Sequence, residues 1–77
     1  MKTYQEVIEQ MINDEAFAMA INGGPSMIYM GTHLVEFIYG VSSKQIYKDI
    51  KAGLTPEVLK NAKKEYNATR RRLLKAA

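Results

Sequence analysis

The chain has 77 residues, which is enough for one domain and too few for two. Hydrophobic residues make up 47% and charged residues 25%, which excludes a disordered tail and indicates a folded globular protein. There is no cysteine, so neither a disulfide nor a thiolate-bound metal can stabilise the fold. No apolar run reaches the roughly 18 residues that span a bilayer, and the first residues turn acidic where a signal peptide would be apolar. We therefore expect a cytoplasmic protein with no membrane contact.

The first predicted element is a helix over residues 4–20. Thr3 and Glu6 have the spacing of a capping box, in which each side chain bonds the backbone N–H of the other residue. Apolar residues then recur at helical spacing. The helix is expected to end before Asn22-Gly23-Gly24-Pro25, because glycine and proline do not continue a helix.

Residues 26–39 are apolar almost throughout. They form either one helix or two, and in the second case Thr32 caps a short helix that ends at Tyr39. A short strand at Met27–Met30 is a further alternative, because apolar runs of this length are ambiguous. The segment is expected to form the buried centre of the domain or a dimer interface.

A third helix is predicted over residues 43–52. Gly40 has the place of the glycine that closes the preceding helix, and Ser42 with Gln45 forms a second capping box. Gly53 is expected to stop the helix. Its buried stripe would be Ile46, Tyr47 and Ile50.

The last predicted helix begins at Thr55-Pro56-Glu57, which combines an N-cap, a proline in the first turn and an acidic residue. The residues expected on its apolar face are Val58, Leu59, Ala62, Tyr66, Thr69 and Leu73. The predicted fold is therefore all-α: one compact domain over residues 1–77, with four to five helices and a long basic C-terminal helix.

Charge is divided unevenly along this fold. Residues 1–43 carry one lysine and five carboxylates, a net charge of −4. Residues 44–77 carry ten lysines and arginines against three carboxylates, a net charge of +7. The asymmetry indicates a polyanionic partner for the C-terminal half. A solubilising surface, or pairing between the two halves of the chain, would also explain it.

The stretch Tyr39–Gly53 resembles the helix-turn-helix of excisionase-like and MerR-like DNA-binding proteins. Their motif commonly has a Gly-Val-Ser turn, an aliphatic–tyrosine pair and a later isoleucine and glycine. The residues that match are Gly40, Val41, Ser42, Ile46, Tyr47, Ile50 and Gly53, and the helix-turn-helix candidate spans residues 32–53. One departure is Glu36, which stands where the family commonly has alanine and where a carboxylate is costly unless exposed or paired. The alternative is a purely structural helix pair.

The resemblance implies a small DNA-binding protein, either a transcriptional regulator or an accessory factor of a mobile element. The start of the helix over residues 43–52 would enter the major groove of double-stranded DNA, and a homodimer would add stability and binding area. Arginines near the C-terminus would contact flanking phosphates. The expected DNA contacts are Ser42, Ser43, Lys44, Gln45, Lys48, Lys51, Arg70, Arg71 and Arg72.

No catalytic constellation is recognisable. His33 is the only histidine, and a metal site would need several carboxylates converging on it. We therefore expect a protein that is not an enzyme and that needs neither a cofactor nor a metal. The alternative function is a small inhibitor or adaptor whose Met-rich, acidic first half docks on another protein.

Overall fold

The computed structural model of this protein describes residues 1–23 and 32–76. These residues form four helices, α1 (Tyr4–Asn22), α2 (Thr32–Tyr39), α3 (Ser43–Gly53) and α4 (Pro56–Ala76), and no strand. The all-α prediction is confirmed. Of the apolar segment 26–39, the part from Thr32 on forms α2, whereas the strand alternative at Met27–Met30 lies outside the described residues.

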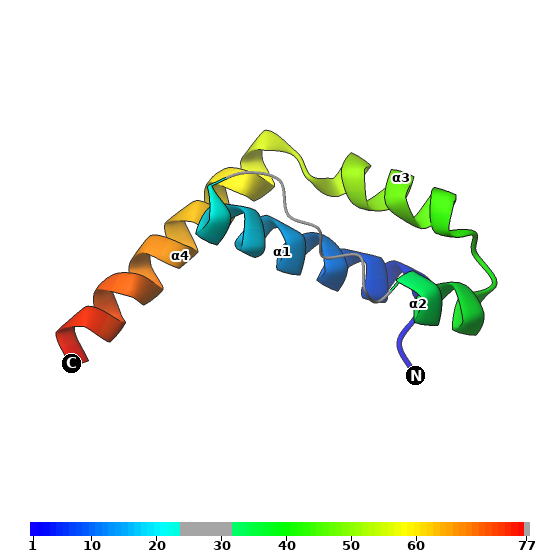
Figure 1. Ribbon diagram of the computed structural model, residues 1–77, viewed down its shortest axis with the longest axis horizontal. Coiled ribbons are helices and arrows are strands. Elements are labelled where there is room, and N and C mark those ends of the chain that lie inside the picture. The colour runs from blue at the N-terminus through cyan, green and yellow to red at the C-terminus, as the bar shows by residue number, and fades with distance from the viewer. Residues whose placement is uncertain (24–31, 77) are drawn as a thin grey trace.

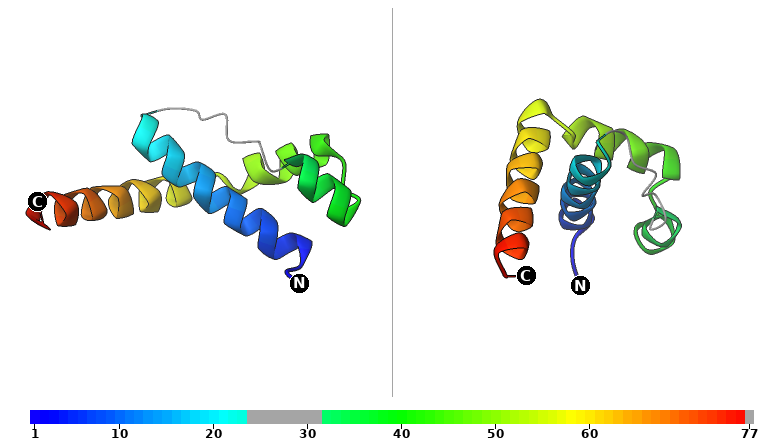
Figure 2. Two further views of the ribbon diagram at one scale, coloured as in Figure 1. Left: turned by 60° about the horizontal axis from the view of Figure 1, so that its bottom comes forward. Right: turned by 60° about the vertical axis from the view of Figure 1, so that its left-hand side comes forward.

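Helix α1 lies in the middle of the molecule (Figure 1). It packs against α4 on one side and against α3 on the other, and α2 packs against α3. The right-hand view of Figure 2 shows α1 between α4 and the α2–α3 pair. The molecule measures 45 × 25 × 18 Å and its radius of gyration is 14.1 Å, whereas a compact domain of this length has about 11.5 Å. The fold is therefore more extended than the compact domain expected from the sequence.

The capping box of α1 is present. The Thr3 hydroxyl accepts from the Glu6 N–H at 3.2 Å, and the Glu6 carboxylate accepts from the Thr3 N–H at 3.0 Å. This backbone N–H is the chief reason why the pKa of Glu6 is lowered. The helix ends at Asn22, and the next residue, Gly23, caps it with a left-handed backbone (φ 73°) and an N–H that donates to the Met19 carbonyl. Helix α1 is thus two residues longer than predicted.

The main core lies where α1, α2 and α3 meet, and it is built on four buried aliphatic side chains: Ile8, Val35, Ile46 and Ile50. Half-buried apolar residues pack around them. Helix α4 stays outside this core. It meets α1 through small side chains, because Ala16 and Ala62 are both buried and line the same pocket. Small residues at a helix crossing let the two backbones come close.

Helix α4 begins as predicted, since the Thr55 hydroxyl accepts from the Val58 N–H at 3.2 Å. Its predicted apolar face is covered only in part. Ala62 is buried and Tyr66 is half-buried, but Leu73 is 65% exposed. The reason is visible in Figure 1, where the outer turns of α4 extend past the end of α1.

The segment that contains α2 was expected to form either the buried centre of the domain or a dimer interface, and the first of these is wrong for much of the surface of α2. Thr32 and Val35 are buried, at 2% and 7% exposure. The other side of the helix is open, and the exposed side chains there are Leu34 (63%), Phe37 (87%) and Ile38 (46%).

Candidate nucleic-acid interface

Three residues join α2 to α3. Gly40 has a left-handed backbone (φ 67°), and its N–H donates to the Glu36 carbonyl at 2.9 Å. The Ser42 hydroxyl caps α3 by accepting from the Gln45 N–H at 3.2 Å. Both of these turn predictions are confirmed. The right-hand view of Figure 2 looks along α2 while α3 runs across it, so the two helices cross steeply.

The side chain of Gln45 departs from the predicted capping box. In a capping box the Gln45 side-chain oxygen would accept from the Ser42 backbone N–H. Here the side chain is turned along α3 instead, and its amide N–H donates to Asp49 Oδ1 at 2.8 Å, one turn further on. The physical reason is that residues four apart on a helix are neighbours, and a hydrogen bond to a carboxylate is stronger than one between neutral groups.

The departure from the family pattern at Glu36 is accommodated by pairing. Glu36 is half-buried, and its Oε2 accepts from the Ser43 hydroxyl at 2.6 Å. Since Ser43 is the first residue of α3, this carboxylate lies at the helix N-terminus, where the helix dipole favours negative charge. The Ser43 hydroxyl would have to leave Glu36 before it could contact a phosphate.

The inner face of α3 is held firmly against the body. Ile46 and Ile50 are 0% and 1% exposed. Gly53, expected to stop the helix, is instead its last residue and has no left-handed backbone. A Cβ atom at this position would lie 2.1 Å from Ile12 Cδ1, so any larger residue would require the Ile12 side chain to move. Helices α1 and α3 therefore approach each other closely at this point.

A hydrogen-bond network joins α3 to the start of α1. The Tyr4 hydroxyl donates to Asp49 Oδ2 at 2.6 Å, and Gln45 binds the other carboxylate oxygen. Burial, and then the hydrogen bond to Asp49, raises the pKa of Tyr4 to about 12. The hydrogen bond from Tyr4, and then that from Gln45, lowers the pKa of Asp49. Tyr4 also packs edge-to-face on Tyr39, with ring centroids 6.0 Å apart.

The outer face of α3 carries three exposed lysines, Lys44, Lys48 and Lys51, which we call the lysine face. At 3.6 residues per turn they fall within about 60° of arc, on the side opposite Ile46 and Ile50. The structure thus brings together three of the nine residues expected to contact DNA. Ser42 and Gln45 are also exposed, but both side chains are engaged in the hydrogen bonds described above.

The arginine cluster, Arg70, Arg71 and Arg72, is exposed as expected. It belongs to the outer turns of α4, which lie at the opposite end of the long axis from α2 and α3 (Figure 1). The lysine face and the arginine cluster therefore lie at opposite ends of the long axis, and the exposed lysines in the first half of α4, Lys60, Lys63 and Lys64, lie between them in sequence.

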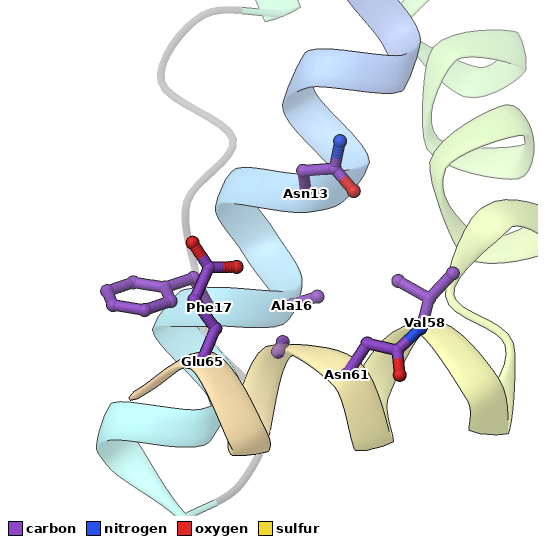
Figure 3. A pocket seen from close by; sticks show the side chains of 7 residues that line it. Asn13, Ala16, Phe17, Val58, Asn61 and Glu65 are labelled. Carbon is purple, nitrogen blue, oxygen red and sulfur yellow. The ribbon is translucent and has the colours of Figure 1, made fainter. Parts of the chain in front are cut away.

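A pocket of about 370 Å³ lies between α1 and α4 (Figure 3). Among its lining residues are two amides, Asn13 and Asn61, and one carboxylate, Glu65, which lies beside Phe17. These groups do not form a nucleophile with an adjacent base. His33 is exposed on α2, and within residues 1–23 and 32–76 no three potential metal ligands lie together. None of the described helices combines the length and apolarity needed to cross a membrane.

One feature that the sequence did not predict is an apolar groove beside the arginine cluster. Phe17 and Ile21 of α1 form one side of it, and Tyr66, Leu73 and Leu74 of α4 the other. The spacing of these residues along each helix was visible in the sequence, but their exposure depends on where α1 ends relative to α4. No family model, curated protein or solved structure matches the chain.

Proposed function

We propose that this protein binds double-stranded DNA through the lysine face of α3. The observation that carries the proposal is the stripe of exposed Lys44, Lys48 and Lys51, directly opposite two fully buried isoleucines. Because the inner face of α3 is fixed to the body, its cationic side is held outward. Such a fixed array of charges binds a polyanion with little loss of backbone freedom on association.

The dimensions of α3 suit a duplex. Its 11 residues are about 16 Å long, and a helix of this width fits the major groove of B-DNA. Lysine is a point charge that suits phosphate oxygens, whereas reading bases needs groups such as a glutamine amide. The Gln45 amide is bound to Asp49 and would have to leave it before reading adenine. We therefore expect phosphate contacts to dominate and sequence preference to be weak.

The arginine cluster would add phosphate contacts at the other end of the molecule. In a homodimer these contacts would be doubled, and the assembly could reach more of a duplex than one copy can. The narrower role of transcriptional regulator or mobile-element accessory factor is supported by the helix-turn-helix resemblance alone.

The test compares two triple variants of equal charge. In one, Lys44, Lys48 and Lys51 are replaced by glutamine, and in the other the exposed α4 lysines, Lys60, Lys63 and Lys64, are replaced in the same way. Loss of three phosphate contacts lowers the slope of log K against log salt by about 2.7, which is about 500-fold in affinity at about 0.1 M salt. We expect this loss for the α3 variant and a much smaller one for the control, measured by fluorescence anisotropy on a labelled duplex.

Two results would count against the proposal. One is an equal loss for both variants, which would mean that only net charge matters. The other is the absence of wild-type binding even at low salt. In that case the exposed apolar side of α2, with Leu34, Phe37 and Ile38, favours the alternative of a protein-interaction module.

A further inference from the structure

The apolar groove between the outer turns of α4 and the end of α1 is not explained by DNA binding. It has a volume of about 470 Å³ and its lining is mostly apolar. Phe17 and Tyr66 pack edge-to-face in it, with ring centroids 6.1 Å apart. Further out, Ile21, Leu73 and Leu74 are 52%, 65% and 66% exposed. Large apolar side chains gathered in this way on a small domain mark a surface that another molecule covers.

At its outer end this groove is surrounded, among the described residues, by positively charged side chains only. Arg70 is part of the lining. At 100° per residue, Arg71 and Arg72 lie about 100–160° around α4 from Tyr66 and Leu73, so Arg70 is the arginine of the cluster that faces the groove. Lys75 follows in the last turn, and the described part of α4 has no carboxylate after Glu65. The inner end, near Phe17, is different, because Asp14 and Glu65 are found there.

We propose that this groove binds a short amphipathic helix of a partner protein, one that carries acidic residues beside two or three large apolar anchors. Anchors at helical spacing are the usual way in which a helix fills a groove of this kind. An acidic side chain at the end of the partner helix that overlies Arg70 would pair with its guanidinium group, which binds a carboxylate in bidentate fashion.

Other occupants fit the groove less well. A nucleic-acid backbone would satisfy the arginines but would leave the leucines uncovered. The same face of a second copy aligned in parallel would bring two arginine-bearing ends of α4 together, and like charges in contact oppose association; an antiparallel copy is distinguished by the sedimentation measurement below. Helix α2 of a second copy offers apolar anchors, but its one carboxylate, Glu36, is already bound to Ser43. Charge complementarity thus favours an acidic partner.

The experiment uses the full chain and two labelled helical peptides of about four turns. Both have leucines at the same helical positions, and one has glutamates where the other has lysines. We expect the acidic peptide to bind at least tenfold more tightly than the basic one, with affinity that falls as salt rises. Replacing Leu73 and Leu74 by serine should weaken binding of the acidic peptide at least tenfold. The matched control replaces Leu34 and Ile38 of α2, which are similarly exposed, and should leave the affinity unchanged.

Because all four of these leucine and isoleucine side chains are exposed, neither double variant should impair folding, and circular dichroism checks this. Equal binding of the acidic and basic peptides would overturn the proposal, and so would equal losses in the two double variants. A dimer in sedimentation that disappears in the Leu73 and Leu74 variant would also overturn it, because a second copy would then be the occupant. Duplex DNA binding should be unaffected by Leu73→Ser and Leu74→Ser, so failure of this proposal is distinguishable from failure of DNA binding.

Discussion

Replacing Gly53 by alanine tests how closely α3 is held against α1. A Cβ atom at this position would lie 2.1 Å from Ile12 Cδ1 and 2.8 Å from Ile12 Cγ1. Carbon atoms in protein cores pack at about 3.5–4.0 Å, so either the Ile12 side chain must leave its rotamer or α3 must move outward. Either response disturbs the packing that orients the lysine face.

Two opposing terms set the size of the effect. Overpacking of a well-packed site costs about 1–3 kcal/mol. The backbone at Gly53 is outside the left-handed region, so alanine would also restrict the unfolded chain and recover about 0.4–1 kcal/mol. The steric term is the larger one. The free energy of unfolding should therefore fall by about 0.5–2 kcal/mol.

Urea denaturation followed by circular dichroism measures this change, and a second background identifies its cause. Ile12→Ala removes all three atoms that a Cβ at position 53 would meet. In that background Gly53→Ala should raise the free energy of unfolding, by about 0.4–1 kcal/mol. The reversal of sign is a coupling between neighbouring residues. If Gly53→Ala lowers stability equally in both backgrounds, the close approach to Ile12 is not the reason for the glycine.

Two further changes probe buried and partly buried polar groups. Glu15 is 3% exposed, and its Oε2 has no hydrogen-bond partner among residues 1–23 and 32–76. Glu15→Met should therefore raise the free energy of unfolding by about 1–3 kcal/mol; a lower melting temperature would contradict this. Tyr4→Phe should remove a contribution of the Tyr4 hydroxyl to the free energy of unfolding. This contribution is full below about pH 10 and is lost as the pH rises through the Tyr4 pKa of about 12. Asp49 has the opposite pH dependence: because its pKa is lowered in the folded protein, its contribution to the free energy of unfolding is lost as the pH falls through that pKa. Urea denaturation of the wild type, Tyr4→Phe and Asp49→Asn across acid and alkaline pH checks both losses.

The helix boundaries were predictable because capping depends on residues close in sequence. Thr3, Ser42 and Thr55 each accept from a backbone N–H three residues later, and no distant contact is needed for this. Gly40 likewise adopts the left-handed backbone that a side chain would disfavour. The buried stripe of α3 was also correct for Ile46 and Ile50, since helical periodicity places both on one face.

The exposure of apolar residues could not be predicted in the same way. Leu73 lies on the same stripe of α4 as Ala62, yet Leu73 is exposed and Ala62 is buried, because α1 ends at Asn22 and α4 continues beyond it. The role of Gly53 also depends on a neighbour distant in sequence, Ile12. Periodicity identifies an apolar face, but only the placement of the other helices determines what covers it.

The surroundings of α3 also bear on how a duplex could approach it. Phosphate capture by the N-terminal amides, at Ser42 and Ser43, would bring an anion close to the Glu36 carboxylate, and two negative charges so near each other repel. Along the side of the helix, Lys44 and Lys51 are separated by about 10 Å of helical rise, and the one carboxylate of α3, Asp49, lies outside the arc of the lysine face. That length is comparable with three or four consecutive phosphates, which advance about 3.4 Å each along a DNA strand. A side-on approach is therefore favoured over an end-on one. This is why we expect the affinity of α3 for DNA to depend on its lysines more than on the groups at its N-terminus.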